Sequence, residues 1–429
     1  MTMTKFDSLK NQRLASAVGY LLFVGMMAVG YYYNITFVQL GLVDLGERLL
    51  HLPEGVMARQ MAGMALLTSL TAVVFGLLMK KTGWVTRFRL KLKLAFLVVA
   101  VQTLLTWAAP NLENQAQLSC WIALTALTLG VGVPVTFSMT VDLIPARSRG
   151  YAAAVITGLV YGMAPALSGN WQIETFSRQM LWVMPLGLLG LGWLAFFPNP
   201  FVDILSEQHL DPRYGKGRFL RDGKPAIGSR RLIGLVLIMF GIFFVDSLGF
   251  LRIIDTPLYI HNNWLSEGLA PRLFLGVVHV LAAWIAGVLY THLNLRSLFA
   301  WVFGIFALVH FMYTLETRIG PGLSISLALP MLYAVAVSLY TVINFALWAD
   351  LSTPGTISLN AALGVALSGW TATFLSTALA LRWRLGGMTL DRHLSLVDAL
   401  ALLFFIALLL SPFLPRKMNS HQRSGDEQS

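Results

Sequence analysis

Stretches of about 20 apolar residues recur along almost the whole sequence, and this recurrence limits the chain to one class of structure. A helix needs about 20 mostly apolar residues to cross the hydrocarbon core of a membrane. The twelve predicted stretches are 15–40, 57–79, 94–109, 117–141, 151–170, 179–198, 232–254, 273–291, 297–315, 322–348, 357–381 and 395–413. Only 12% of the residues are charged, far below the proportion that a water-covered surface needs. The sequence therefore predicts an integral membrane protein.

Positively charged residues are distributed unevenly among the segments that connect these spans. Most of the 31 Lys and Arg residues fall in the two termini and in every second connection, above all in residues 80–93, which contain no acid. Because cytoplasmic loops collect Lys and Arg, both termini are predicted to be cytoplasmic in a multi-pass protein of the cell membrane. The first span lacks a small-residue cleavage site and is expected to be retained. This bias accounts for the net charge of +11, so nucleic-acid binding is not expected.

The longest polar segment divides the twelve spans into six and six, and the two halves of the chain echo each other. Asp142 and Asp350 are separated by almost the same number of residues as Gly76 and Gly287. A shared spacing close to half the chain predicts a parallel repeat of two helical bundles. The predicted domains are an N-terminal six-helix bundle at 1–198, a cytoplasmic linker rich in Pro, Gly and charge at 199–231, and a C-terminal six-helix bundle with a short tail at 232–429.

A short motif after the fourth span carries a resemblance to a known family. The segment "DLIPARSRG" has an acid, a proline and an Arg-Gly pair at Asp142, Pro145, Arg149 and Gly150. It resembles the signature that the sugar-porter branch of the major facilitator superfamily carries between helices 4 and 5. A second motif, "GLLMKKTG", is similar to the loop 2/3 signature of that superfamily at Gly76, Leu78 and Gly83, with Lys80 in place of its acid.

The resemblance implies an all-α integral membrane fold, with twelve transmembrane helices in two pseudo-symmetric six-helix bundles around a central cavity. In that family, charged groups at these helix ends pair and hold the cytoplasmic side shut. By this resemblance the cytoplasmic gate comprises Asp142, Pro145, Arg147, Arg149, Gly150, Gly76, Gly83 and Asp350. The alternative is plain positive-inside anchoring with a Pro-Gly turn, which explains the arginines but not the acid at Asp142.

Asp246 is the clearest ionisable residue inside a predicted span. A charged side chain at the centre of a membrane helix costs roughly 2.5 to 3.5 kcal/mol on insertion scales, so such a residue is a functional candidate. We predict that Asp246 carries a proton or binds donor groups of a solute. The alternative is an ion pair with Arg59 that only holds the bundle together. Arg252 and Asp255 are spaced to pair with each other, as an outer gate or a structural pair.

Other polar residues in the spans complete the predicted cavity. They are Tyr33 and Asn34 in "GYYYNITF", Arg59 and Gln60 in the second span, His279 in the eighth and Asn344 in the tenth. An aromatic belt at the outer interface would equally explain the tyrosines. Arg59 can instead snorkel outward, and His279 can be a packing residue. The spans 179–198 and 395–413 are apolar all round, which predicts that they face lipid.

Several motifs that would indicate another class of protein are missing from the sequence. We find no phosphate-binding P-loop, no His cluster with metal-ligand spacing and no serine hydrolase elbow, so no cofactor, metal or enzymatic activity is expected. The single cysteine, Cys120, has no disulfide partner.

We therefore expect a monomeric secondary transporter in the lipid bilayer that moves a small organic solute by alternating access, with protons as a coupling partner through Asp246. A non-transporting scaffold, sensor or assembly factor with the same fold is the main alternative, and a lipid-modifying enzyme is a weaker one. A gate motif does not define the solute, because the solute binds in the cavity.

Overall fold

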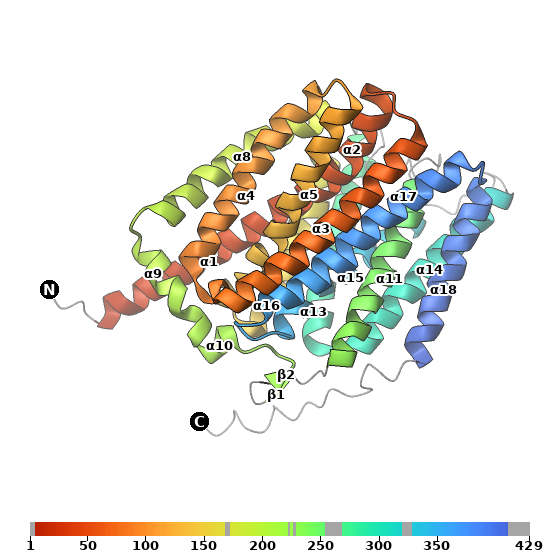
Figure 1. The fold of residues 1–429 in the computed structure, drawn as a ribbon. Helices are drawn as coiled ribbons and strands as arrows, with labels where there is room; N and C mark the ends of the chain where they lie inside the picture. Colours follow the sequence, from red (N-terminus) through yellow and green to blue (C-terminus); the bar gives the residue numbers. More distant parts are fainter. Residues whose placement is uncertain are drawn as a thin grey trace.

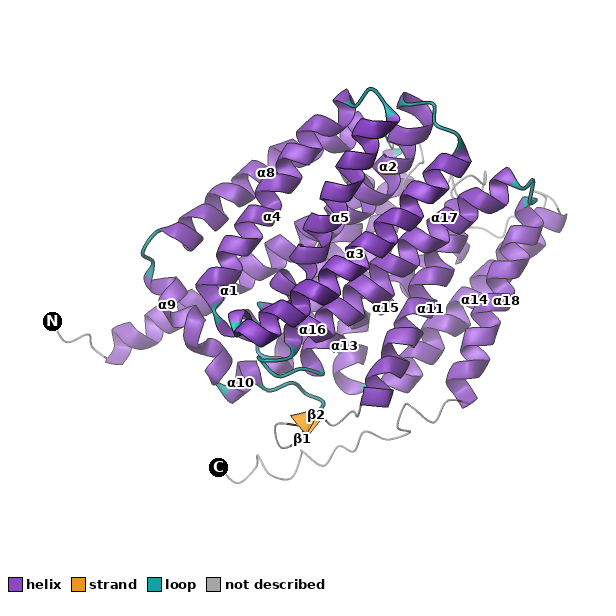
Figure 2. Cartoon of the chain, in the orientation of Figure 1, coloured by secondary structure: helices purple, strands orange, loops and turns teal. Residues whose placement is uncertain are grey.

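The chain is almost entirely helical, and its long helices run side by side as one bundle (Figure 1, Figure 2). The computed structural model describes residues 5–167, 172–221, 224–225, 229–253, 268–319 and 328–410. Asp255 lies outside the described residues, so its predicted pair with Arg252 stays a prediction.

The helices before the linker follow the order of the predicted spans. They are α1 (Lys5–Tyr32), η1 (Tyr33–Leu40), α2 (Gly41–Asp44), η2 (Leu45–Leu49), α3 (Glu54–Thr82), η3 (Trp84–Thr86), α4 (Phe88–Ala108), η4 (Ala109–Asn111), α5 (Gln115–Ser138), α6 (Thr140–Leu143), η5 (Ala146–Ser148), α7 (Arg149–Leu167) and α8 (Ile173–Phe196). Of these, η1 and η2 are π-helical, and they continue the first helix without a break to Leu49. The first span is therefore longer than the predicted 15–40.

The linker is not the open loop that its composition suggests. It contains α9 (Pro200–Glu207), η6 (Gln208–Leu210), α10 (Pro212–Gly215) and the hairpin strands β1 (Leu220–Arg221) and β2 (Lys224–Pro225). Asn199 and Asp211 cap α9 and α10 with their side chains, each followed by a proline in the first turn. We call the end of the bundle that carries the linker the linker end, and the opposite end the far end (Figure 1).

The helices after the linker repeat the pattern of the first half. They are α11 (Ser229–Ile253), α13 (Leu269–His292), α14 (Leu295–Ile319), α15 (Ala328–Asp350), α16 (Ile357–Ala361), the π-helical η7 (Ala362–Trp370), α17 (Thr371–Leu385) and α18 (Leu390–Leu410). Eleven helical segments of the described chain are long and apolar enough to cross a membrane. The remaining predicted span, 151–170, corresponds to α7, which is described as far as Leu167.

The helix contacts repeat when the two halves are exchanged. Within the first half α3 packs on α5 and α4 on α8, and within the second half α13 packs on α15 and α14 on α18. Between the halves α7 packs on α13, and the counterpart of that contact is α17 on α3. This exchange symmetry confirms the predicted class, an all-helical membrane fold of two pseudo-symmetric bundles. The domain boundaries at 198 and 231 stay a prediction.

Burial follows from the composition of each helix. The two helices that are apolar all round, α8 and α18, are the least buried of the membrane-spanning helices and present Trp182, Leu186 and Leu189 of α8 to the outside. In contrast, α15 passes through the middle of the molecule and is the most buried. Gly364 of η7 leaves room there for the indole of Trp348, since a Cβ atom at Gly364 would lie 1.9 Å from that ring. The core therefore lies around α15, between the halves.

Candidate functional site

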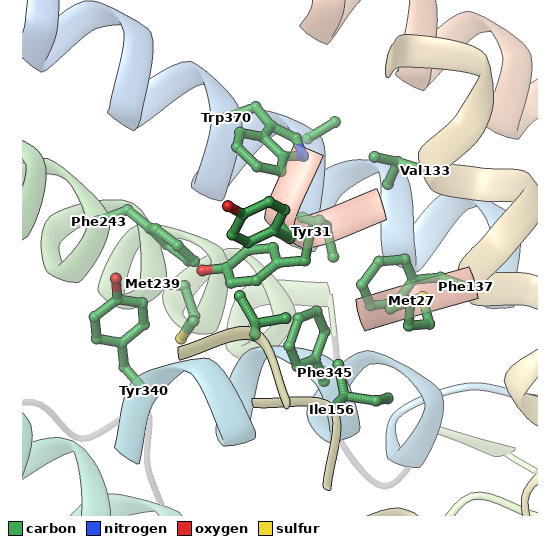
Figure 3. Close-up of a cluster of buried hydrophobic side chains, with 14 of the residues drawn as sticks. Met27, Tyr31, Val133, Phe137, Ile156, Met239, Phe243, Tyr340, Phe345 and Trp370 are labelled. Carbon is green, nitrogen blue, oxygen red and sulfur yellow. The ribbon is translucent and has the colours of Figure 1, made fainter. Parts of the chain in front are cut away.

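Two small cavities lie at the centre of the bundle, in the interface between the halves. The far-end cavity has a volume of about 70 Å³ and the linker-end cavity about 90 Å³. Tyr31 and Trp370 belong to the walls of both, so the two cavities adjoin across these rings. Figure 3 shows the two rings together, with Phe243 and Tyr340 to one side of them and Phe137 to the other. Phe243 and Tyr340 line the far-end cavity, and Phe137 lines the linker-end cavity. Both volumes are below the 300 to 1,000 Å³ that is usual for ligand pockets.

Two π-helical segments border these cavities. Asn34, Ile35 and Gln39 of η1 lie in the cavity walls, and Trp370 is the last residue of η7. A π-helical turn changes the direction of the side chains that follow it and is often found at functional sites. The first and eleventh membrane helices thus depart from α geometry where they meet the central space.

Asp246 contributes the only acidic side chain among the described residues in the walls of the two cavities. It lies in the far-end part of α11 and keeps accessible surface toward the cavity. Tyr340 donates a hydrogen bond to Oδ2 at 2.5 Å, and Tyr333 donates one to Oδ1. Both tyrosines come from α15 and are seven residues apart, a spacing that places them on the same face of the helix. One side of α15 therefore holds this carboxylate.

Aromatic rings form a large part of the remaining wall of the far-end cavity. Tyr31 meets Phe345 edge to face with ring centres 4.9 Å apart, and its hydroxyl lies 3.2 Å from the hydroxyl of Tyr161. Tyr161 in turn stacks on His279 at 4.8 Å, and Nδ1 of His279 lies 3.1 Å from the Ser338 hydroxyl. These contacts join α1, α7, α13 and α15 into one continuous aromatic wall.

Four of the residues predicted for the cavity do lie in the cavity walls. Asp246 and His279 line the far-end cavity, and Asn34 and Asn344 line the linker-end cavity. Oδ1 of Asn344 accepts a hydrogen bond from the Trp348 indole at 3.0 Å. In contrast, the buried Oδ1 of Asn34 has no hydrogen-bond partner within the described part of the chain.

The other three residues predicted for the cavity lie elsewhere. Tyr33 is buried behind the cavity, where it stacks on Phe37. Arg59 is exposed near the start of α3, and Gln60 donates to Ser119 on the neighbouring helix at 2.7 Å. None of the three is part of either wall. The alternative ion pair between Asp246 and Arg59 is likewise wrong, because the Asp246 carboxylate is held by two tyrosines.

A buried ion pair joins the two halves at the linker end. Arg149 at the start of α7 contacts Asp350 at the end of α15 with an N···O distance of 3.0 Å, and neither side chain is exposed. Tyr290 donates a hydrogen bond to Asp350 at 2.9 Å, and Arg218 of the linker approaches the same carboxylate at 3.8 Å. Arg149 also donates to the backbone oxygen of Tyr214 at 2.5 Å. The linker is therefore part of the contact between the halves.

A second buried pair lies within the first half. Asp142 pairs with Lys91 of α4, both side chains being fully buried, and His209 of the linker lies 3.4 Å from the same carboxylate. Asp142 thus pairs with a lysine of its own half, whereas Arg149 pairs with an aspartate of the other half. Arg147 is exposed, and Pro145 begins the turn η5 between them.

Glycines allow the helices of the two halves to touch at this end. A Cβ atom at Gly76 would lie 2.9 Å from the Ser358 backbone oxygen, and one at Gly150 would lie 3.0 Å from the Tyr290 ring. One at Gly287 would lie 2.7 Å from the Cβ atom of Ala154. Gly83 has a different role, because it ends α3 with a φ of 69°, a backbone conformation that glycine adopts without strain.

Ion pairs also join the halves at the far end. Arg384 at the end of α17 contacts Glu47 at 2.5 Å and Glu54 at 2.7 Å, both from the first half. Deeper in the bundle, Gln39 donates to Ser247 at 2.9 Å across the same interface. Arg252 lines a small pocket with Glu47 and Arg384. The described residues therefore include contacts between the two halves at both ends of the central space.

Several residues of this site were not singled out from the sequence. Lys91 is one of several basic residues in 80–93, and Arg384 lies just after the predicted span 357–381, so neither stands out in the sequence. The aromatic residues Tyr333, Tyr340 and Trp370 resemble ordinary core residues in sequence. Only helix phase would have identified them, since Tyr333 and Tyr340 are spaced to share one face of a helix.

The described residues include no group of three or more His, Cys, Asp or Glu side chains that could hold a metal ion. The polar chemistry available in the described walls is therefore that of one carboxylate, one imidazole, and hydroxyl and amide groups, beside aromatic rings.

The comparisons with known proteins identify the fold. No family model and no curated protein sequence matches the chain. The human organic anion transporter MFSD10 has a similar structure, with a TM-score of 0.58 at 16% identity over 92% of this chain and 99% of that one. The E. coli xylose transporter XylE, in a partially occluded inward-open conformation, has a TM-score of 0.58 at 13% identity over 93% of this chain and 96% of that one. The E. coli fucose:proton symporter FucP has a TM-score of 0.51 at 12% identity over 92% of this chain and 99% of that one. The chain therefore has the major facilitator fold.

Proposed function

We propose that this protein is a secondary transporter that moves a small organic solute across the membrane by alternating access. The observation that carries this proposal is a central polar and aromatic space between two pseudo-symmetric bundles, with contacts between the bundles at each end. A solute site at the interface of the repeats, near mid-depth, is the arrangement that alternating access requires. Rocking of the bundles opens one end while the contacts at the other end persist.

The gate at the linker end is assigned to Asp142, Arg149 and Asp350. Arg149 and Asp350 come from different halves and lie at the ends of their helices, so they separate when this end opens. Gly76 and Gly150 support the gate, because the absence of a Cβ atom at each lets helices of the two halves touch when this end is closed. From the distribution of Lys and Arg we assign the linker end, with both termini, to the cytoplasm.

The gate at the far end is assigned to Arg384 with Glu47 and Glu54. These pairs cross the interface between the halves and are partly exposed, as expected at a surface that opens to solvent. Arg252 lies beside them and is assigned to the same gate.

Asp246 is assigned to coupling with protons. A carboxylate at membrane depth is stable when it is protonated or when a cation approaches it, so its protonation changes between states that differ in access to water. Two tyrosine hydroxyls hold the side chain at the cavity wall in either form.

Unsatisfied polar atoms support a solute site in the same space. Oδ1 of Asn34 and Nε1 of Trp370 are buried and have no hydrogen-bond partner among the described residues. Such groups are rare in folded proteins, because an unmade buried hydrogen bond is costly. An acceptor and a donor in the wall of the linker-end cavity provide two points at which a solute can be oriented.

Reconstituted protein tests the proposal. A thermal-shift screen of metabolites and drugs identifies solutes that raise the melting temperature, and these are then tested in liposomes. Wild-type protein is expected to show counterflow of such a solute and accumulation driven by a pH gradient. Asp246→Asn is expected to lose the accumulation driven by the pH gradient. If wild-type liposomes show no counterflow for any solute that binds, the protein is instead a scaffold, sensor or assembly factor with a transporter fold.

A further inference from the structure

The charge balance of the central space restricts the class of solute. Asp246 is the single acid in the described walls of the two cavities, and these walls contain no Lys or Arg side chain. The nearest guanidinium groups at the far end, Arg252 and Arg384, line a separate pocket with Glu47. Among the described residues, an ionised Asp246 therefore has no cationic partner in the cavity walls.

The groups that face Asp246 from the neighbouring helices do not supply a permanent positive charge. They are Tyr333 and Tyr340 of α15, Tyr31 of α1, Tyr161 of α7, His279 of α13 and, behind Tyr333, His310 of α14. Trp370 and Thr373 face it from η7 and α17. The tyrosine hydroxyls donate hydrogen bonds to the carboxylate but leave its charge uncompensated. Only a proton or a bound cation can neutralise it there.

The rest of the far-end wall suits an organic cation. The faces of aromatic rings carry negative partial charge and attract cations, most strongly after both partners have lost water. The rings that line the far-end cavity are Tyr31, Tyr161, Phe243, Phe250, Tyr333, Tyr340 and Trp370. A carboxylate in a wall that contains these rings offers a site for a positively charged group that carries apolar substituents.

Anionic and neutral solutes fit this wall less well. An anion would meet Asp246 and the negative ring faces without a cation in the described walls. A neutral polyol needs several hydrogen-bonding partners, but both oxygens of Asp246 already accept from tyrosines, and His279 lies beside Ser338. An organic cation needs neither a cationic partner nor several hydrogen-bonding partners in the wall.

Resting on the proposed transport function, we propose that the solute is an organic monocation, an amine or quaternary ammonium with an aromatic or aliphatic body, and that this cation and a proton neutralise Asp246 in turn. Binding of the cation releases the proton of the carboxyl group, and departure of the cation lets a proton return. The charge of the site is the same in both states. The protein then exchanges one organic cation for one proton.

Three ligands of one shape test the assignment in purified full-length protein. The cation is 4-hydroxyphenyltrimethylammonium, its neutral isostere is 4-tert-butylphenol, and the anion is 4-hydroxybenzenesulfonate. We expect the cation alone to raise the melting temperature and to quench tryptophan fluorescence at millimolar concentration or below. Under conditions in which Asp246 is protonated, binding of the cation is expected to release about one proton per site into weakly buffered solution.

Variants connect the result to the carboxylate. Asp246→Asn is expected to weaken binding of the cation by roughly 30-fold or more and to abolish proton release, while Asp246→Glu restores both in part. Asp203→Asn, which removes an exposed carboxylate of the linker, is the matched control and is expected to bind normally. The melting temperature without ligand shows whether each variant is folded.

Two results would overturn the assignment. One is equal binding of the neutral or anionic ligand by the wild type, or no binding of the cation. The other is unchanged binding of the cation by a folded Asp246→Asn variant. Neither result touches the transport proposal, which fails only if counterflow is absent for every solute that binds.

Discussion

At the scale of single residues, burial determines how each charged side chain is partnered. Lys91 and Asp142 have no exposed surface and are paired with each other. Asp350 is also fully buried, and two arginines and a tyrosine hydroxyl surround it. Asp246 is held differently, by hydroxyl groups alone. The pairs at the linker end therefore depend on both partners, whereas Asp246 is left open to a change of charge.

Removal of one member of a buried pair is expected to destabilise the protein more than removal of both. Lys91→Met leaves Asp142 buried beside His209 alone, and we expect a loss of about 3 to 5 kcal/mol in the free energy of unfolding. Lys91→Met combined with Asp142→Asn should recover part of this loss. Denaturant or thermal unfolding in detergent measures both variants. Equal stability of the single variant and the wild type would show that the pair contributes nothing.

The predicted cavity residues show what sequence can and cannot establish at this scale. A polar or ionisable residue in an apolar span is conspicuous, and Asp246, His279 and Asn344 were found by this criterion. The direction in which a side chain points from its helix is harder to predict, because residues two positions apart point about 200° apart around the helix axis. Tyr31 therefore lines both cavities, whereas Tyr33 faces away from them.

At the scale of helices, close contact between the halves depends on small residues at two related places. Gly287 of α13 lies against Ala154 of α7, and Gly76 of α3 lies against Ser358 of α16. A larger side chain at either place must push a helix of one half away from the other. These contacts lie at the linker end, so their loss affects that end first.

Gly287→Ala is expected to shift the protein toward states with an open linker end. A Cβ atom at this position would lie 2.7 Å from that of Ala154, closer than real side chains allow. Spin labels at the exposed positions Lys81 and His292, in a Cys120→Ser background, report the separation of the halves. We expect a longer average distance for this variant. Gly25→Ala, where a Cβ atom meets nothing within 4 Å, is the control and should leave the distance unchanged.

The number of helices and the repeat of the two halves could be predicted, because apolar length and repeat spacing are written directly in the sequence. The π-helical segments η1 and η7 could not, since no local sequence pattern distinguishes them from α-helix. The helices of the linker were missed for another reason. Their length is short, and the signal for them is limited to the caps at Asn199 and Asp211.

At the scale of the whole molecule, ion pairs join the two halves at both ends, and these pairs differ in exposure. Arg149 and Asp350 at the linker end are buried, whereas the Arg384 side chain at the far end is 36% exposed and its partner Glu47 29%. Salt screens exposed charges far more than buried ones. The sequence predicts the fold but not which end is open, because one folded chain can adopt several conformations that differ in which end is open.

The two ends are therefore expected to respond differently to ionic strength. Raising salt, or the substitution Arg384→Gln, should increase the population that is open at the far end, measured by spin-label distances across that end. Arg149→Gln should instead open the linker end. Arg318→Gln removes a far-end pair within one half and is the matched control, with no expected effect. Identical responses at both ends would contradict this difference.

The linker touches the charged groups of both halves, since His209 lies beside Asp142, and the Phe219 amide donates to the backbone oxygen of Asp350 at 3.0 Å. If the protein works by the proposed alternating access, movement of the two bundles alone does not open the linker end, because the linker must first detach from both. This detachment would add a kinetic barrier that is independent of the solute, so changes in a segment that does not contact the solute would alter the rate of transport.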